Sequence, residues 1–394
     1  MANTILTPTA VLREVLRVAH EKASFIGTIQ RQYDSSFAKS GAKIGDSLKI
    51  RLPNEYTVRT GKTLSTQDTT ESSVTLAVAT QKGVDVSFSS AELTMDLQDF
   101  SKRIIEPAMS VLMSTLDSDA LTSMTKEVYN HVGTPGTAPT FAQIAKAKAK
   151  LNQNLAPKNM AERHIQMESV DMATSVDALK ALFHDPKQIQ KQYREGVIGT
   201  AAGLNWTENE RAYSHTTGSD FTTVTINDAG SLEGVVSMTS AGGNFTAGDI
   251  FTMAGAYSVH PETKATMASL KQFVVTTAGT TTLAFTPALI STGAKQNVSA
   301  LPANGAALVF VGTASTAYPN ALTYHSEAFA WASADLELPK GVDFAARENM
   351  DGISARIVRA YDISNDLFPC RIDILHGFKA IRPQWACRSY GSGA

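Results

Sequence analysis

The sequence predicts a mixed α+β protein in which one long helix lies between strand-rich regions. Residues 97–129 repeat apolar side chains at three- and four-residue steps, the spacing of one helix face. The residues on either side alternate apolar and polar side chains, the spacing of β-strands. A long helix in this position indicates an extended subunit, although the same periodicity also fits a core helix of a globular enzyme.

The predicted helix has recognisable ends. Asp96 can cap its first turn, and Asn130, Gly133 and Pro135 follow its last turn, where helices usually stop. At roughly 1.5 Å per residue the stretch would form a rod of about 50 Å. Pro107 lacks a backbone N–H, so we expect it to kink or reset the rod.

Composition limits the possible classes of protein. The 394 residues are enough for about two or three domains. The chain carries 35 Lys and Arg against 37 Asp and Glu, so its net charge of -2 argues against a basic nucleic-acid-binding protein. No secretory signal and no membrane-spanning stretch are predicted. Cys370 and Cys387 form no metal or redox motif, so two free, buried thiols are expected.

The N-terminal part is predicted to contain an arm followed by a β-hairpin. An amphipathic helix over residues 8–24 leads into a polar segment, and its apolar face docks either on a neighbouring chain or on its own subunit. Alternating strands are predicted around 48–52, 74–78 and 84–88. A polar tip joins the first two strands, and such a ribbon needs a sheet beneath it or another chain beside it.

The middle of the chain is predicted to form an α/β unit. Thr140 and Gln143 make a capping box that opens a helix whose lysine-rich face we expect to be solvated rather than bound to phosphate. Residues 163–167 are predicted to form a strand, and a second helix follows and ends at Asp185. Glycines at 196, 199 and 203 match no nucleotide-binding pattern and indicate turns.

A change of composition marks residues 221–315 as an inserted β-domain. Thr, Ser, Ala and Gly dominate, charges are rare, and short apolar runs recur between turn signals. This pattern predicts a small antiparallel barrel or sandwich, with strands at 223–226, 234–238, 250–253, 273–277, 282–286 and 307–311. Residues 316–394 return to the earlier composition, and strands at 353–361, 370–376 and 378–381 are expected to complete the α/β domain.

The sequence contains no recognisable catalytic motif. The histidines occur singly in different regions, and the sequence contains neither HExxH nor GxSxG. Carboxylate pairs such as Asp117 with Asp119 and Asp362 with Asp366 are expected by chance in a chain of this length. The sequence therefore predicts no enzyme, no catalytic or metal site and no cofactor.

Three stretches carry a resemblance to a known family: DFSKRIIEPAM at 99–109, REGVIGTAAGLNW with a later HTTG at 194–218, and RAYDISNDLFPCRIDILHGFKAIRPQWA at 359–386. They and the order of parts resemble the major capsid (coat) protein of tailed bacteriophages, which has the Hong Kong 97 fold. Within that family the chain is similar to the coat proteins of short-tailed Salmonella phages, which carry an inserted β-barrel. The resemblance covers nearly the whole chain.

The resemblance implies a role for each segment. It assigns 1–45 to the N-terminal arm, 46–95 to the extended hairpin (E-loop) region, and 96–133 to the spine helix of the peripheral domain. It assigns 134–220 to the first part of the axial α/β domain, 221–315 to the inserted antiparallel barrel, and 316–394 to the return through both domains. The self-crosslinking chemistry of some relatives is not carried over, because no motif places it here.

The family implies a non-enzymatic subunit made in the host cytoplasm that assembles with itself, as hexamers and pentamers, into an icosahedral virion shell. That shell encloses double-stranded DNA without sequence-specific binding or a membrane, and a scaffolding protein and a portal protein are expected partners. The hairpin tip supplies the candidate inter-subunit contacts, namely Arg59, Lys62, Asp68 and Glu71. The alternatives are a β-rich tail or adhesion protein and an enzyme of unrecognised type.

Overall fold

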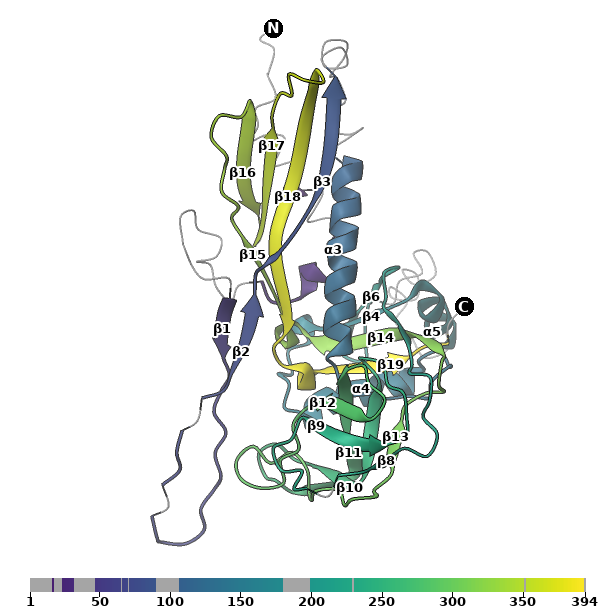
Figure 1. The fold of residues 1–394 in the computed structure, drawn as a ribbon. Helices are drawn as coiled ribbons and strands as arrows, with labels where there is room; N and C mark the ends of the chain where they lie inside the picture. The colour runs from purple at the N-terminus through teal and green to yellow at the C-terminus, as the bar shows by residue number, and fades with distance from the viewer. Residues whose placement is uncertain are drawn as a thin grey trace. The chain divides into compact units, whose positions relative to one another are not determined.

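The computed structural model describes residues 16–17, 23–31, 47–89 without 65 and 70, 106–179, and 199–392 without 229 and 351 (Figure 1). Contacts within the chain divide it into two compact units. The first unit comprises Met1–Arg51, Ser73–Ala120 and Phe329–Ile381, and the second comprises Leu52–Ser72, Leu121–Ala328 and Arg382–Ala394.

The first unit is built on a five-stranded antiparallel sheet. Its strand order is β15 (Phe329–Ala334), β18 (Leu367–Ala380), β17 (Ile353–Arg359) and β16 (Phe344–Met350), and β3 (Thr80–Ser89) also pairs with β18. β3 and β18 keep one register over ten residues, from Ser89 opposite Leu367 to Thr80 opposite His376. The expectation that the strands near 353–381 complete the α/β sheet is therefore wrong, because their edges are taken by β3, β15 and β16.

The predicted hairpin forms from β1 (Ser47–Arg51) and β2 (Ser73–Ala77). The two strands pair in antiparallel register from Ser47 opposite Ala77 to Arg51 opposite Ser73. One face of each strand is buried, as shown by Ile50 and Leu76. The hairpin prediction is therefore confirmed, and residues 52–72 form the connecting loop.

The long helix is α3, Glu106–Lys126. Pro107 is the second residue of α3 that the structure describes, so the predicted kink or reset of the rod at Pro107 stays a prediction. The part predicted at 97–105 lies outside the described residues, and the helix ends three residues before Tyr129. The predicted apolar stripe is confirmed, since its members are almost completely buried: Met109, Leu112, Met113, Leu116, Ala120, Leu121 and Met124.

Asp117 interrupts the apolar stripe of α3 and ties down the segment at 23–31. Its buried carboxylate accepts hydrogen bonds from the Ser24 hydroxyl at 2.8 Å and from the Phe25 and Ile26 amides at 2.9 Å. Trp331 N donates to Gln30 O at 3.0 Å, so the same segment also joins β15. This part of the predicted arm packs on its own unit; residues 1–15 lie outside the described chain.

The second unit contains a mixed sheet that carries the predicted α/β unit. Its strand order is β19 (Ala386–Tyr390), β14 (Ala317–His325), β4 (Arg163–Met167), β6 (Leu204–Glu208) and β5 (Thr200–Ala201), and β7 (Ser214–Thr216) pairs with β14. β4 and β6 are parallel, with α5 (Ser169–Leu179) between them in the chain.

α4 (Phe141–Gln153) precedes this sheet and begins at the predicted capping box. Gln143 N donates to the Thr140 hydroxyl at 3.3 Å, and Thr140 N donates to the Gln143 side chain at 3.0 Å. Both hydrogen bonds satisfy amides that a helix start leaves without partners, so the prediction is confirmed. Four short 3-10 turns complete the described elements: Ile26–Thr28, Met160–Glu162, Ser326–Ala328 and Pro383–Trp385.

The low-charge segment forms a separate antiparallel sheet in the second unit. Its strand order is β13 (Leu308–Phe310), β10 (Ile250–Val259), β11 (Thr266–Thr277), β12 (Thr282–Thr286), β9 (Ser237–Ala241) and β8 (Thr225–Ile226). A bridge between Thr225 and Ala307 joins the two ends of the sheet, so the barrel is nearly closed. Its interior is one apolar cluster that includes Phe245, Phe251, Phe273, Phe285 and Leu283.

The burial of Leu116 generates a test of α3. Leu116 has no exposed surface, whereas Val111 on the same helix is 64% exposed. We expect Leu116→Ala to lower the free energy of unfolding by about 2 to 5 kcal/mol, because it leaves a cavity. Val111→Ala should change it by no more than about 0.5 kcal/mol. Denaturant unfolding of both variants measures these free energies. Equal losses of unfolding free energy would show that the two positions do not differ in packing.

Candidate functional site

The four charged residues selected from the sequence all lie on the loop between β1 and β2 (Figure 1). Arg59, Lys62, Asp68 and Glu71 are exposed. Arg59 Nη1 donates to the carbonyls of Gly61 and Thr63 within the loop. The structure therefore places these residues on an accessible surface, with Arg59 also holding the turn at the tip.

Gln67 holds the two arms of this loop together. Thr57 N donates to Gln67 Oε1 at 2.8 Å, and Gln67 Nε2 donates to Thr57 O at 2.6 Å. The side-chain amide thus pairs with a backbone peptide as a neighbouring strand would. The Thr57 hydroxyl adds a third bond to Oε1 at 3.0 Å. One side chain therefore supplies part of the strand pairing that the loop lacks.

The loop also exposes apolar side chains, which the sequence analysis did not single out. Val58 is 96% exposed, Leu64 80% and Tyr56 57%. Each is isolated among polar neighbours in the sequence, so no periodic pattern marks it. Isolated exposed apolar residues are common on proteins, and these three lie on a single loop.

A second region of interest is the neck where the barrel leaves the mixed sheet. β7 and β14 pair from Ser214 opposite Pro319 to Thr216 opposite Ala317. The Thr217 hydroxyl donates to Thr313 O at 2.6 Å and accepts from Thr316 N at 3.0 Å. The two ends of the inserted chain therefore stay side by side, and the barrel starts and finishes at one point of the sheet.

Asp249, the residue before β10, secures the barrel to the neck. Its buried carboxylate accepts from His215 Nε2 at 2.8 Å and from Thr246 N at 2.7 Å. Gly218 N lies 3.2 Å from Oδ2 and 3.3 Å from Oδ1. A buried carboxylate is tolerated only where such donors replace water. Asp249 is thus held by donors from both the barrel and the neck.

The partners of His215 define its proton positions. A carboxylate only accepts, so Nε2 carries the hydrogen, and Nδ1 faces the Tyr213 hydroxyl at 2.9 Å. Burial lowers the pKa of His215 despite the hydrogen bond to Asp249, which raises it, and the charge of Arg388 lowers it further. His215 is therefore neutral at pH 7, with Nδ1 accepting from Tyr213.

Arg388 on β19 supplies the positive charge beside this cluster. Its side chain is fully buried, and Nη2 donates to Gly248 O at 2.7 Å. Burial lowers the pKa of Arg388, while Asp249 is among the groups that raise it. A guanidinium keeps its charge at neutral pH, so Arg388 is a fixed cation in this cluster.

A separate contact joins the barrel to the residues after α3. Gln272 on β11 donates through Nε2 to His131 O at 2.9 Å and accepts from His131 N at 3.0 Å. Tyr129 packs beside this pair with Ile250 and Val274. The lysines of α4 were expected to lie on a solvated face of that helix. Lys150 instead lines a nearby pocket.

Nothing in the described part of the chain makes an obvious catalytic centre. Tyr213, His215 and Asp249 have the residue types of a proton relay, but His215 and Asp249 are buried. The described residues contain no group of His, Cys, Asp or Glu arranged to hold a metal ion. None of the helices within those residues is long and apolar enough to cross a membrane. Cys370 and Cys387 are buried free thiols.

Comparisons with known proteins relate part of the chain to a known protein family. Residues 231–388 match the family model of the P22 coat protein, gene protein 5. No curated protein matches the chain in sequence.

Several solved capsid structures are similar at low identity. A protein of Mycobacterium phage Che8 is 12% identical with a TM-score of 0.47, over 93% of this chain and 90% of that one. The capsid of cyanophage P-SCSP1u is 11% identical with a TM-score of 0.43, over 89% and 85%. The CUS-3 coat protein I-domain is 24% identical with a TM-score of 0.21, over 24% of this chain and all of that one. These likenesses are distant, and the family match covers residues 231–388.

Over residues 231–388 the chain is therefore similar to a coat protein of tailed bacteriophages. This match supports the resemblance identified in the sequence. The structure also confirms the predicted α+β class with an inserted antiparallel β-barrel.

The role of Asp249 can be tested by one isosteric change. Asp249→Asn replaces one carboxylate oxygen with an amide N–H₂ group. This group donates and cannot accept the hydrogen bonds of the backbone donors that face it. We expect a loss of about 1 to 3 kcal/mol for each buried donor left unsatisfied. Asp220→Asn is the control, since Asp220 is exposed and accepts from Thr222 N at 2.9 Å. Denaturant unfolding that gives equal midpoints for the two variants would contradict the role of Asp249.

The buried histidines of the second unit predict acid sensitivity. Burial, and then the charge of Arg388, lowers the pKa of His131 to about 3, and burial also lowers the pKa of His215 and His325. The unfolded imidazoles take up protons below pH of about 6.5 while the folded ones do not, so this stability is present above that pH and lost as pH falls.

Each such histidine should remove up to about 1.4 kcal/mol of unfolding free energy per pH unit below 6.5. Denaturant midpoints measured from pH 7 down to about 5.5 test this above the range in which carboxylates titrate. His131→Gln should reduce the slope. A midpoint that stays constant over this range would show that the folded histidines titrate normally.

Proposed function

We propose that this chain is the repeating subunit of an icosahedral shell that encloses the double-stranded DNA of a tailed phage. Copies of the chain assemble as hexamers and pentamers, with a scaffolding protein and a portal protein as further partners. The chain is synthesised in the host cytoplasm and performs no catalysis. The family match over residues 231–388 supports this proposal.

Each segment has a role within the proposal. Residues 1–45 are the arm, 46–95 the extended loop region, and 96–133 the spine helix. Residues 134–220 begin the axial domain, 221–315 form the inserted domain, and 316–394 return through the axial and peripheral domains. The neck at Thr217 and Thr316 supports an insertion bounded close to these limits.

The observation that carries the proposal is the loop at 52–72. Val58 and Leu64 are almost fully exposed on a loop whose arms Gln67 holds together. Covering apolar surface with another chain stabilises the contact by about 25 cal/mol per Å². The charges of Arg59, Lys62, Asp68 and Glu71 flank these residues and set the orientation and specificity of the contact.

Closed symmetry converts such modest contacts into a stable particle. Every subunit in a shell makes the same contacts with several neighbours, so separating one subunit requires breaking them together. The net charge of -2 suits this mode of assembly, because the copies repel one another little. A chain without a strong basic excess also holds DNA loosely and without reading its sequence.

Loop variants test the proposal. We expect deletion of residues 59–68 to leave a folded chain that forms few or no shells, and Val58→Ser with Leu64→Ser to weaken assembly in the same direction. Thr60→Ser with Thr66→Ser is the matched control, since it changes the same loop without removing an apolar side chain. Electron microscopy and sedimentation with the cognate scaffolding protein measure shell yield, while circular dichroism checks folding. Normal shells from the deletion variant would refute the assigned contact.

A further inference from the structure

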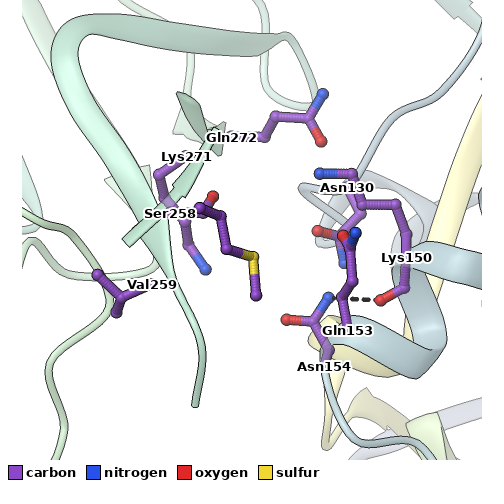
Figure 2. A pocket seen from close by; sticks show the side chains of 9 residues that line it. Asn130, Lys150, Gln153, Asn154, Ser258, Val259, Lys271 and Gln272 are labelled. Atoms are coloured by element: carbon purple, nitrogen blue, oxygen red, sulfur yellow. Dashed lines mark hydrogen bonds between the residues drawn. The ribbon is translucent and has the colours of Figure 1, made fainter. Parts of the chain in front are cut away.

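A small polar pocket lies between the barrel and α4, inside the second unit. Figure 2 shows Lys271 and Gln272 of β11 on one side, and Asn130, Lys150, Gln153 and Asn154 on the other. The volume open to the centre of a water molecule is about 20 Å³, enough for one water-sized particle. The pocket is part of neither the exposed loop nor the Asp249 cluster.

The charges that line this pocket are unbalanced. Lys150 and Lys271 are both half-buried, and the nine lining residues, all within the described chain, include no carboxylate. Lys271 Nζ lies 5.0 Å from the centre of the Tyr129 ring, which offsets only part of its charge. Burial lowers the pKa of Lys150, and burial together with the charge of Lys150 lowers the pKa of Lys271 to about 8. Lys271 therefore stays mostly charged at pH 7, although the charge of Lys150 opposes its own charge.

Neighbouring groups do not supply the missing negative charge. Burial raises the pKa of the Cys387 thiol to about 12, although Lys150 and Arg388 act to lower it, so the thiol is neutral. Burial also raises the pKa of the Tyr129 hydroxyl, which stays protonated. The amides of Gln272 and Asn130 already bond to backbone groups of His131, Gln384 and Ala386.

We propose that this pocket binds one small monovalent anion, chloride in the cell, between the ammonium groups of Lys150 and Lys271. The anion accepts from both lysines and from Gln153, which lines the same side as Lys150 (Figure 2). The small volume open to the centre of a water molecule fits a monatomic anion better than a tetrahedral oxyanion, which carries four oxygens. Because β11 and α4 each contribute one cation, the anion bridges the barrel to its parent domain.

Chlorine NMR of the purified, unassembled full-length chain tests the site directly. Exchange of chloride with a protein site broadens its signal, and we expect saturable broadening for the natural chain. Lys150→Met with Lys271→Met should weaken chloride binding about tenfold or more, because charge-assisted hydrogen bonds are lost. Lys146→Met should leave binding unchanged, since Lys146 is exposed one turn earlier on α4. Absent broadening, or equal broadening in the double variant, would overturn the proposal.

Thermal unfolding shows whether the double variant has a folding defect. At equal ionic strength the natural chain should unfold at a higher temperature in chloride than in gluconate, which is too large for the pocket. The double variant should fold, since it removes two half-buried like charges, and its unfolding temperature should be the same in chloride and gluconate. Lys271→Gln keeps a polar group and should reduce the difference in unfolding temperature. Sulfate is tested as a competitor in the same way. If sulfate displaced chloride from the natural chain more strongly than gluconate does, the assignment to a monatomic anion would be wrong.

Discussion

The inserted barrel depends on a single constraint, namely that its chain enters and leaves at adjacent strands. The pairing of β7 with β14 fixes both ends, and the Thr217 hydroxyl bonds across the gap to Thr313 and Thr316. A barrel held only at such a neck could rotate about it. Asp249 opposes this rotation by accepting from His215 at the neck and from Thr246 in the barrel.

A second contact, away from the neck, attaches the barrel to the residues after α3. Gln272 pairs with the backbone of His131, and Val274 and Ile250 pack on Tyr129. Polar contacts of this kind hold their geometry because each buried donor and acceptor is costly to leave unpaired. The barrel is thus positioned by directional hydrogen bonds, whereas its interior is held by nondirectional apolar packing.

Asp117 applies the same chemistry in the first unit. Its carboxylate gathers two backbone amides and one hydroxyl from residues 24–26, and so holds a segment distant in the sequence against α3. A buried carboxylate is stable only when several donors surround it, so the conformation of that segment and the charge of Asp117 depend on each other.

Local features of the fold could be predicted from the sequence, and long-range pairings could not. The Thr140 capping box, the stripe of α3 and the β1–β2 hairpin follow from spacings of a few residues. The assignment of the strands near 353–381 to the wrong sheet arose because alternation shows which residues face inward and not which strand lies beside them. The pairing of β18 with β3 joins residues almost three hundred positions apart in the chain.

The polar residues that matter most were visible in the sequence but were not interpreted. Asp117 lies four residues after Met113 and three before Ala120, so it falls on the apolar stripe of α3, where a charge requires a buried partner. Lys150 lies three residues after Ala147 and one before Leu151, at the edge of the buried face of α4. Its position distinguishes it from the exposed Lys146, although periodicity alone does not reveal the pocket on β11 that it meets.

The described loop at 52–72 differs from the barrel in how its conformation is maintained. It has no strand ladder between Arg51 and Ser73, and the Gln67 amide supplies bonds that join its arms. A segment with few internal hydrogen bonds deforms at low cost, whereas a nearly closed barrel does not. On the proposed function this division is useful, since hexamers and pentamers place the same sequence in different surroundings. The loop can then adjust to each neighbour while the barrel, fixed by Asp249 and Gln272, keeps one geometry in every copy.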